Sequence, residues 1–268
     1  MHITYLSIFP ELFDSFRETT LISRAVKNKK LKFETINPRH FCEDKHRIVD
    51  DEIYGWGHGL LMKAPPIIAA VRHWMEKRNL KTSPSFPLLA ERDDHKDKSP
   101  SSSYEEGLGW GLHEGPRVRS KKFLIILPHP SQDVFNQSHA HDRSEYSHLL
   151  FVCGRYEGID ERVWLWLQKN FPDHVVRVSL GQFVTLGWEL PAMTMTEAVV
   201  RLIPWVINTE MSWIDESYSV DMNMENLEHP QYTRPEIVED MSVPEVLLSG
   251  HHKKIEEWKR GESRRVEE

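Results

Sequence analysis

The pattern of apolar and polar positions predicts a chain in which strands alternate with helices. Strands are predicted at residues 3–9, which are rich in β-forming residues, and at 31–36. Short apolar runs, of the kind that a parallel sheet buries on both faces, occur at residues 123–127, 149–152 and 175–178. Apolar residues recur at helical spacing over residues 12–26, 65–75 and 192–202. The alternation of these two kinds of element predicts an α/β domain with a mostly parallel sheet.

Two stretches interrupt this pattern and divide the chain. Between about residues 77 and 122 the sequence is polar, charged and rich in Ser and Pro, which predicts a flexible surface insertion within a domain spanning residues 1–202. After Pro204 the chain becomes acidic and irregular, so we expect a linker over residues 203–228. A small helical C-terminal domain is then predicted over residues 229–268.

Composition narrows the class of protein. The 268 residues are 28% charged and 39% hydrophobic, as in soluble globular proteins. No apolar run reaches the roughly 18 residues of a membrane span, and the N-terminus lacks the basic segment of a signal peptide. We therefore expect a cytoplasmic protein with no membrane partner. Two cysteines, Cys42 and Cys153, are too few for a disulfide framework.

The charge is unevenly distributed. Residues 24–47 carry eight Lys and Arg against three acidic residues, whereas residues 210–245 carry ten acidic residues and one Arg. The basic stretch is compatible with RNA binding, but a solvated face is the commoner explanation of such a stretch. Charge alone leaves both interpretations open.

Three glycine-containing loops are the candidate ligand sites. Residues 54–62 hold three glycines in five positions, which permits a close approach by a ligand, although an ordinary turn also explains them. Residues 153–162 follow a predicted strand directly, where α/β proteins bind ligands; a capped helix start explains the acidic residues there but not the two glycines. Residues 179–191 form a long, half-apolar loop before a helix and could surround an adenine ring.

In this order, the three loops resemble those of the bacterial tRNA (guanine-N1)-methyltransferases of the TrmD type. The likeness covers nearly the whole chain except the 77–122 insertion. It includes residues 7–10, 24–26, 46–51, 54–62, 135–137, 153–163, 187–192, 229–235 and 244–252. The resemblance implies a SPOUT-class fold with a deep trefoil knot, and a homodimer with the active site between subunits. It implies methylation of N1 of guanine 37, immediately 3′ of the anticodon in tRNA, with S-adenosylmethionine as the cofactor.

The resemblance also implies which residues form the sites. The expected cofactor-binding residues are Leu127, Pro130, Gly154, Tyr156, Glu157, Leu180, Gly181, Gln182, Phe183, Val184, Thr185, Gly187, Trp188 and Pro191. The expected substrate-binding residues are Arg24, His46, Arg47, Asp50, Tyr54, Gly55 and Gly57.

Three charged residues are the expected catalytic group. N1 of guanine carries a proton at neutral pH, and a carboxylate within hydrogen-bond reach can take it as the methyl group arrives. The resemblance assigns this role to Glu216, where the family has an aspartate, with Asp215 as the second candidate and Arg201 as the group that stabilises the developing charge. From the residues alone, a solvated acidic linker explains Asp215 and Glu216 better.

The sequence departs from the family at three glycine positions, which hold Trp56, Trp188 and Trp205. The chain has 9 tryptophans and only 13 glycines, so one cause is suggested: the source reads the codon UGA as glycine, and the printed sequence translates it as tryptophan. The rival explanation is divergence into a catalytically impaired homologue that still binds tRNA. Milder departures are Gln132, Gln182 and Phe183, and the C-terminal domain is expected to be truncated.

No metal site is expected, although the chain has fifteen histidines. Pairs such as His139 and His141, or His251 and His252, lack carboxylate or cysteine partners at ligand spacing, so surface histidines are the better interpretation. This argues against a metal-dependent hydrolase, which metal content after dialysis would reveal. The resemblance leaves open a need for Mg²⁺ in the RNA step.

Overall fold

A five-stranded parallel sheet forms the centre of the molecule. The computed structural model describes residues 1–80, 121–130, 133–207, 216–218 and 226–265. The strand order is β2-β1-β6-β5-β7, and every neighbouring pair is parallel. The strands are β1 (His2–Leu6), β2 (Lys32–Ile36), β5 (Lys121–Pro128), β6 (Tyr146–Val152) and β7 (Val175–Val178). Each overlaps a predicted strand, so the mixed α/β class with a parallel sheet is confirmed.

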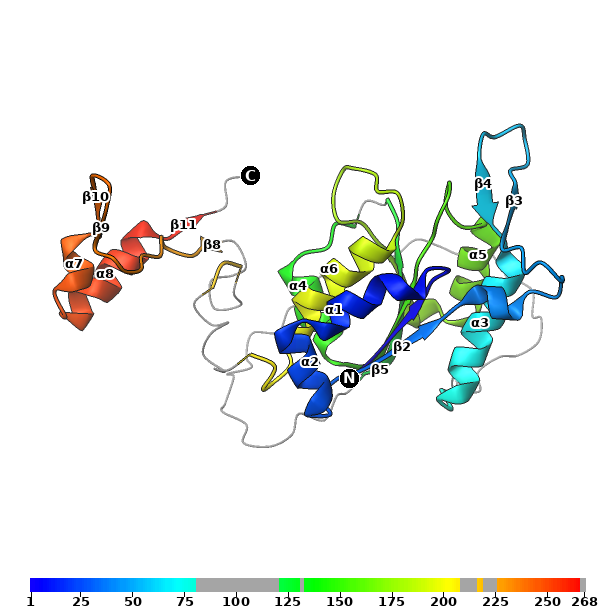
Figure 1. Cartoon of the computed structure of the whole chain (residues 1–268), viewed down its shortest axis with the longest axis horizontal. Coiled ribbons are helices and arrows are strands. Elements are labelled where there is room, and N and C mark those ends of the chain that lie inside the picture. Colours follow the sequence, from blue (N-terminus) through cyan, green and yellow to red (C-terminus); the bar gives the residue numbers. More distant parts are fainter. Residues whose placement is uncertain (81–120, 131–132, 208–215, 219–225, 266–268) are drawn as a thin grey trace, which may run out of the picture.

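Helices cover both faces of the sheet (Figure 1). One face packs against η1 (Pro10–Phe13), α1 (Asp14–Glu18), α2 (Thr20–Lys27), α4 (Gln137–Ser144) and α6 (Glu189–Val200). The other packs against η2 (Pro38–Phe41), α3 (Ala64–Lys77), α5 (Glu161–Asn170) and η3 (Pro172–His174). The result is three layers, with a hydrophobic cluster on each side of the sheet.

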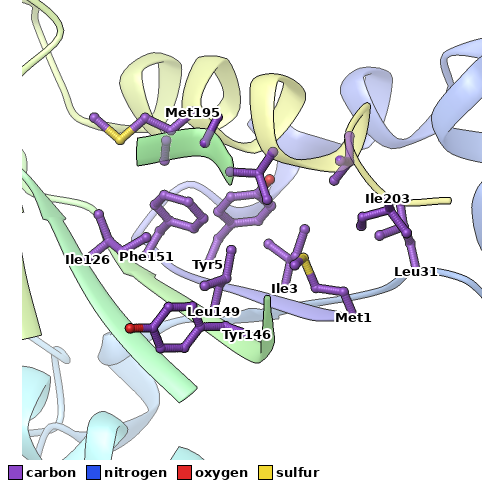
Figure 2. Packing of buried hydrophobic residues seen from close by; sticks show 14 of the residues in the cluster. Met1, Ile3, Tyr5, Leu31, Ile126, Tyr146, Leu149, Phe151, Met195 and Ile203 are labelled. Carbon is purple, nitrogen blue, oxygen red and sulfur yellow. The ribbon is translucent and has the colours of Figure 1, made fainter. Parts of the chain in front are cut away.

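The alternation of side chains along the strands builds these two clusters. In β6, Leu149 and Phe151 point to the α6 side, whereas Leu150 and Val152 point to the α3 side. Figure 2 shows the first cluster, in which Tyr5, Phe151 and Met195 meet between the sheet and α6. These four strand residues and Tyr5 are all fully buried, as the unbroken apolar runs of the sequence require.

Two helical predictions need correction. The single helix expected over residues 12–26 is broken, because Thr19 has extended backbone (φ −58°, ψ 145°) between α1 and α2. The helix expected from residue 192 begins at Glu189. Helix α4 was not predicted; it buries only Ala140 and Arg143, so it has no apolar period to detect. The start of α5 agrees with the capped helix that was the alternative for residues 153–162, since the Asp160 side chain accepts from the Arg162 amide as its N-cap.

A hairpin carries the first glycine-rich loop. Strands β3 (Asp50–Glu52) and β4 (Leu60–Met62) are antiparallel, and residues 53–59 connect them. The loop after β6 fixes the base of this hairpin, because the Glu157 amide donates to the Leu60 carbonyl (3.0 Å) and the Met62 amide to the Gly158 carbonyl (3.0 Å). The first two candidate loops are therefore joined by backbone hydrogen bonds.

The C-terminal part contains short elements. They are β8 (Asn226–Leu227), β9 (Ile237–Val238), β10 (Met241–Ser242), α7 (Glu245–Leu248), α8 (His252–Glu262) and β11 (Arg264–Arg265). The Trp258 ring lies near the rings of His229 and Tyr232, at 6.1 and 6.3 Å. Most of the predicted insertion and of the predicted linker lies outside the described residues, and the domain boundaries stay predictions. In the described part of the chain, no helix is long and apolar enough to cross a membrane.

The first residue of β1 predicts a pH dependence of stability. Burial, with the nearby positive charges of His148 and Lys32, lowers the pKa of His2 from 6.5 to about 4. Between these pH values the unfolded chain binds the proton more readily, so stability falls as pH drops from 6.5 towards 4. His2→Gln is expected to flatten this loss, measured by denaturant unfolding at pH 7 and pH 5. The ring is only partly buried, so the effect is modest. An unchanged pH dependence would contradict the assignment.

Candidate functional site

A cleft lies at the carboxyl ends of β5 and β7, the edge at which parallel α/β sheets bind ligands. Two chain segments line it, one following β5 and one following β7. The lining residues are Pro128, His129, Pro130, Val178, Ser179, Leu180, Phe183, Val184, Thr185, Trp188 and Pro191. The surface is mostly apolar, with the Ser179 and Thr185 hydroxyls and the His129 ring as its polar side-chain groups.

The loop after β7 is held by its own hydrogen bonds. The Ser179 hydroxyl accepts from the Gly181 amide (3.1 Å) and donates to the Gly181 carbonyl (2.8 Å). The Ser179 backbone bonds to Asp133 and Phe135 on a neighbouring segment, both at 2.8 Å. Near the other end, the Thr185 hydroxyl donates to the Gly187 carbonyl (2.8 Å). An irregular loop is thereby fixed in place at both ends without a strand or helix.

Gly154, two residues after the end of β6, forms a flat cradle beside the cleft. A Cβ atom at residue 154 would lie 2.8–2.9 Å from the Trp188 indole, closer than any real contact allows. The Trp188 amide also donates to the Gly154 carbonyl (3.1 Å). The bare glycine backbone therefore accepts a flat two-ring system against it, and in this chain that ring is the indole of Trp188.

The buried carboxylate of Glu189 connects three segments of the chain next to the cleft. Glu189, the first residue of α6, is 1% exposed. Its carboxylate accepts from the Ser7 hydroxyl (2.6 Å) at the end of β1, and lies 2.8 Å from the Arg155 Nε as an ion pair without good hydrogen-bond alignment. The arginine also stacks over the Phe9 ring, 4.7 Å from its centre. These contacts link the loops that follow β1, β6 and β7.

A second charged pair lies at the other end of α6. The Arg201 Nη2 and the Glu216 Oε2 are 2.5 Å apart, although the residues are separated by 15 positions. The Glu216 side chain is 15% exposed and the Arg201 side chain 45%. The second carboxylate oxygen of Glu216 is buried without a hydrogen-bond partner among the described residues. Asp215 lies outside the described residues.

The predicted cofactor residues divide into three groups. Those that line the cleft are Pro130, Leu180, Phe183, Val184, Thr185, Trp188 and Pro191. Those in the same loops but outside the lining are Gly154, Tyr156, Glu157, Gly181, Gln182 and Gly187. Leu127 points into the core on the α3 side, so only its backbone could reach a ligand. Of the other lining residues, Pro128, His129 and Ser179 lie in the predicted loops without having been singled out, and Val178, the last residue of β7, was missed; the convergence of strand ends would have indicated it.

The predicted substrate residues lie along the hairpin and its approach. His46, Arg47 and Tyr54 are exposed, Tyr54 by 95%. Those with structural roles are Asp50, which pairs with Met62 in the hairpin, Gly55, which has positive φ (80°), and Gly57, whose Cβ would clash with Ile53. Arg24, on α2, is half-buried and donates to the Val206 carbonyl (3.2 Å).

Two other chemistries find no support at this site. Cys153 is fully buried, and burial with the negative charge of Glu189 raises the pKa of its thiol, so it is a poor nucleophile. Within the described ranges, no group of three or more His, Cys, Asp or Glu side chains is placed to hold a metal ion.

The fold is that of an α/β protein with a cleft, its candidate ligand site, at the carboxyl ends of β5 and β7. The chain matches the family described as tRNA (guanine-1)-methyltransferase TrmD over residues 1–87 and 113–267. It is similar to the tRNA (guanine-N(1)-)-methyltransferases of Bacillus pumilus (36% identity over 98% of this chain and 87% of the relative) and Staphylococcus carnosus (37%, over 97% and 84%). That of Listeria monocytogenes is 36% identical, over 98% and 87%. The chain belongs to the tRNA (guanine-N1)-methyltransferase family, as its motifs predict.

Proposed function

We propose that the protein transfers a methyl group from S-adenosylmethionine to N1 of guanine 37 in tRNA. Family membership supports a tRNA methyltransferase, as the relatives are named. The observation that carries the chemistry is the partly buried carboxylate of Glu216, whose side chain is 15% exposed, with one oxygen paired to Arg201 and the other without a partner in the described residues. This oxygen, unpaired within the described residues, would serve as the acceptor that removal of the N1 proton requires.

The chemical character of the cleft suits the adenosine part of S-adenosylmethionine. Leu180, Val184 and Pro191 give apolar contact, and the cradle at Gly154 already accepts a flat bicyclic ring. When bound, S-adenosylmethionine would supply a methyl group on a sulfonium, whose leaving group departs neutral. The protein's task is then to orient the methyl group and the base. The fit fails at Trp188, whose indole lies where such a ring would bind.

The geometry of α6 supports a homodimer with a shared active site. Trp188 and Arg201 are the N-cap and C-cap residues that flank this helix, thirteen positions apart, which at 1.5 Å per residue is roughly 20 Å. Within one chain, the cleft and the Arg201–Glu216 pair are too far apart to act on one methyl group. A second copy could bring its pair to this cleft. Leu186, Leu190 and Val184, which are 94%, 67% and 86% exposed, offer an apolar surface for it.

The connection after β7 supports the knotted topology. β7 is at the sheet edge beside β5, yet the chain that follows it crosses to the end of β6, where Gly187 pairs with Arg155. Such a crossing is what a threaded trefoil knot requires.

For tRNA, we propose the basic segment at residues 24–47, the exposed hairpin loop and the C-terminal elements as the contact surface.

The test is a methylation assay on defined tRNA. The purified protein with Trp188, and its Trp188→Gly variant, are each incubated with S-adenosylmethionine and a tRNA transcript that has guanine at position 37. We expect 1-methylguanosine in the digested product, and none from a transcript with adenine at 37. A second candidate, a tRNA-binding homologue without catalysis, is favoured by Trp188 alone. It predicts tRNA binding with no methyl transfer by either chain.

Gly154→Val is expected to abolish S-adenosylmethionine binding. The valine Cβ would lie within 2.9 Å of the present position of the Trp188 ring. It therefore fills the cradle whether residue 188 is tryptophan or glycine. The measurement is calorimetric titration, made in the Trp188→Gly background so that the indole does not mask the effect. Gly261→Val is a control, since a Cβ at that position meets nothing within 4 Å. Unchanged affinity in Gly154→Val would remove the cradle from the cofactor site.

A further inference from the structure

The tryptophans of the described chain fall into two groups by their surroundings. Trp74 is fully buried and donates from its indole to the Thr4 hydroxyl (3.0 Å). Trp164 and Trp166 stack with arginines at 4.4 and 5.3 Å, and Trp258 lies against the ring of His229. These four side chains have the apolar or stacking partners that so large a residue normally finds. Trp56, Trp188 and Trp205 differ.

Trp205 occupies the glycine position of a tight turn. The Val206 amide donates to the Ile203 carbonyl (3.1 Å), which makes residues 203–206 a four-residue turn with Pro204 and Trp205 at its centre. Trp205 has φ of 71°. Proline followed by a residue with positive φ is the pattern of a type II turn, in which glycine is the usual second residue. The tryptophan side chain is 66% exposed, so packing does not compensate for this backbone.

Trp56 is in a similar position at the tip of the β3–β4 hairpin. Gly55 and Trp56 have φ of 80° and 63°, so two consecutive residues are left-handed. Hairpin turns with this backbone favour glycine at the second of the two positions. The Trp56 residue is 98% exposed. A bulky residue with positive φ and almost no contact is a genuine outlier.

Trp188 differs from Trp56 and Trp205, because its side chain occupies a possible ligand surface while its backbone is unstrained. Its φ of −95° is open to any residue, but its indole fills the cradle that Gly154 leaves bare. The indole is a flat two-ring system of about the size of a purine base. It therefore occupies the surface that would receive the base of an adenosine-containing ligand.

We propose that residues 56, 188 and 205 are glycines in the natural protein, and that glycine at 188 opens the cradle to the purine of the cofactor. One cause accounts for all three, since UGA codons read as glycine in the source would appear as tryptophan in a translation that assigns them to tryptophan. The statement about the cradle rests on the proposed function. The statement about residues 56 and 205 rests on positive φ together with exposures of 98% and 66%, whereas Tyr156 and Tyr218, which also have positive φ, are 46% and 43% exposed.

Two measurements on three variants test the proposal. The first is calorimetric titration of S-adenosylmethionine into the printed chain and into Trp188→Gly, for which we expect an affinity gain of about tenfold or more. The second is the thermal midpoint of the double variant Trp56→Gly/Trp205→Gly, which we expect to be unchanged or higher. Trp166→Gly is the matched control, because it removes a packed indole from the interior of α5. We expect it to lower the midpoint without any gain in affinity.

The outcomes separate the inference from the proposed function. If the chain with Trp188 binds S-adenosylmethionine as tightly as Trp188→Gly, the inference that the indole blocks the cradle is wrong, and the proposed function stands. If neither chain binds it while both are folded, the cofactor assignment fails. A midpoint lowered in Trp56→Gly/Trp205→Gly as much as in Trp166→Gly would overturn the glycine assignment at residues 56 and 205. Mass spectrometry of peptides from the natural source decides residue identity directly, and tryptophan at 188 there would refute it.

Discussion

Glu216→Ala is expected to reduce methyl transfer to guanine N1 by about 10²–10⁴-fold, the usual contribution of a positioned general base. Glu216 is the acid that the structure pairs with Arg201, at 2.5 Å, and that keeps one buried oxygen without a partner among the described residues. Without this carboxylate the N1 proton loses its proposed acceptor, and Arg201 loses the counter-ion that it has among the described residues. The measurement is single-turnover methyl transfer with saturating tRNA, made in the Trp188→Gly chain.

Controls separate a catalytic loss from a binding loss. Glu216→Ala should keep its affinity for S-adenosylmethionine, because Glu216 is not among the residues that line the cleft. Glu216→Asp keeps the carboxylate and should retain part of the activity, whereas Glu216→Gln should not. Activity of Glu216→Ala within a few-fold of the parent would refute the assignment and move the search to Asp215.

Mixing two inactive chains tests the shared site. A Gly154→Val chain has a defective cleft and an intact Arg201–Glu216 pair, and a Glu216→Ala chain has the reverse. In a mixed dimer, one of the two active sites would combine the intact cleft of one copy with the intact pair of the other. Activity should then reappear on co-expression. Its absence, with mixed dimers present, would show that each chain forms its site alone.

The parallel sheet could be predicted because its strands are buried on both faces. Leu149 to Val152 are all fully buried, so the apolar run needs no alternation to be detected. The helices were predicted less well, because a helix is recognised by the spacing of its apolar residues, and this spacing does not reveal a local break in the backbone. The break at Thr19 depends on one backbone angle, and α4 has almost no apolar face.

The site was predictable in its loops but not in its contacts. Each glycine-containing loop follows an apolar run or precedes a helix, and that order is visible in the sequence. The lining by His129 and Ser179 depends on β5 and β7 being neighbours, which the sequence does not state. The resemblance placed Arg201 and Glu216 in one catalytic group, but their ion pair was not predicted, since no periodicity connects residues across an irregular segment. That Glu189 is buried could not be foreseen, because an acidic residue at the start of a helix is usually exposed.

Glu189→Ala is expected to lower the free energy of unfolding by about 3–5 kcal/mol, the range for breaking a buried ion pair from one side. The carboxylate is 1% exposed, accepts from Ser7 at 2.6 Å and neutralises Arg155, whose side chain is only 22% exposed. Alanine leaves the arginine without its counter-ion and the Ser7 hydroxyl without its acceptor. The value should fall near the lower limit, because Arg155 keeps some contact with water and with the Phe9 ring.

Glu161→Ala is the matched control for this prediction. Like Glu189, Glu161 is the first residue of its helix and pairs with an arginine, Arg177, at 2.5 Å. Its side chain is 59% exposed, however, so its loss should cost less than about 1 kcal/mol. Denaturant unfolding of both variants measures the difference, and Glu189→Gln should lie between them because it keeps the acceptor for Ser7 but not the charge. Equal losses in the two alanine variants would mean that burial adds nothing to the Glu189 pair. A large loss confined to Glu189→Ala would identify it as the residue that holds the loops after β1, β6 and β7 together around the cleft.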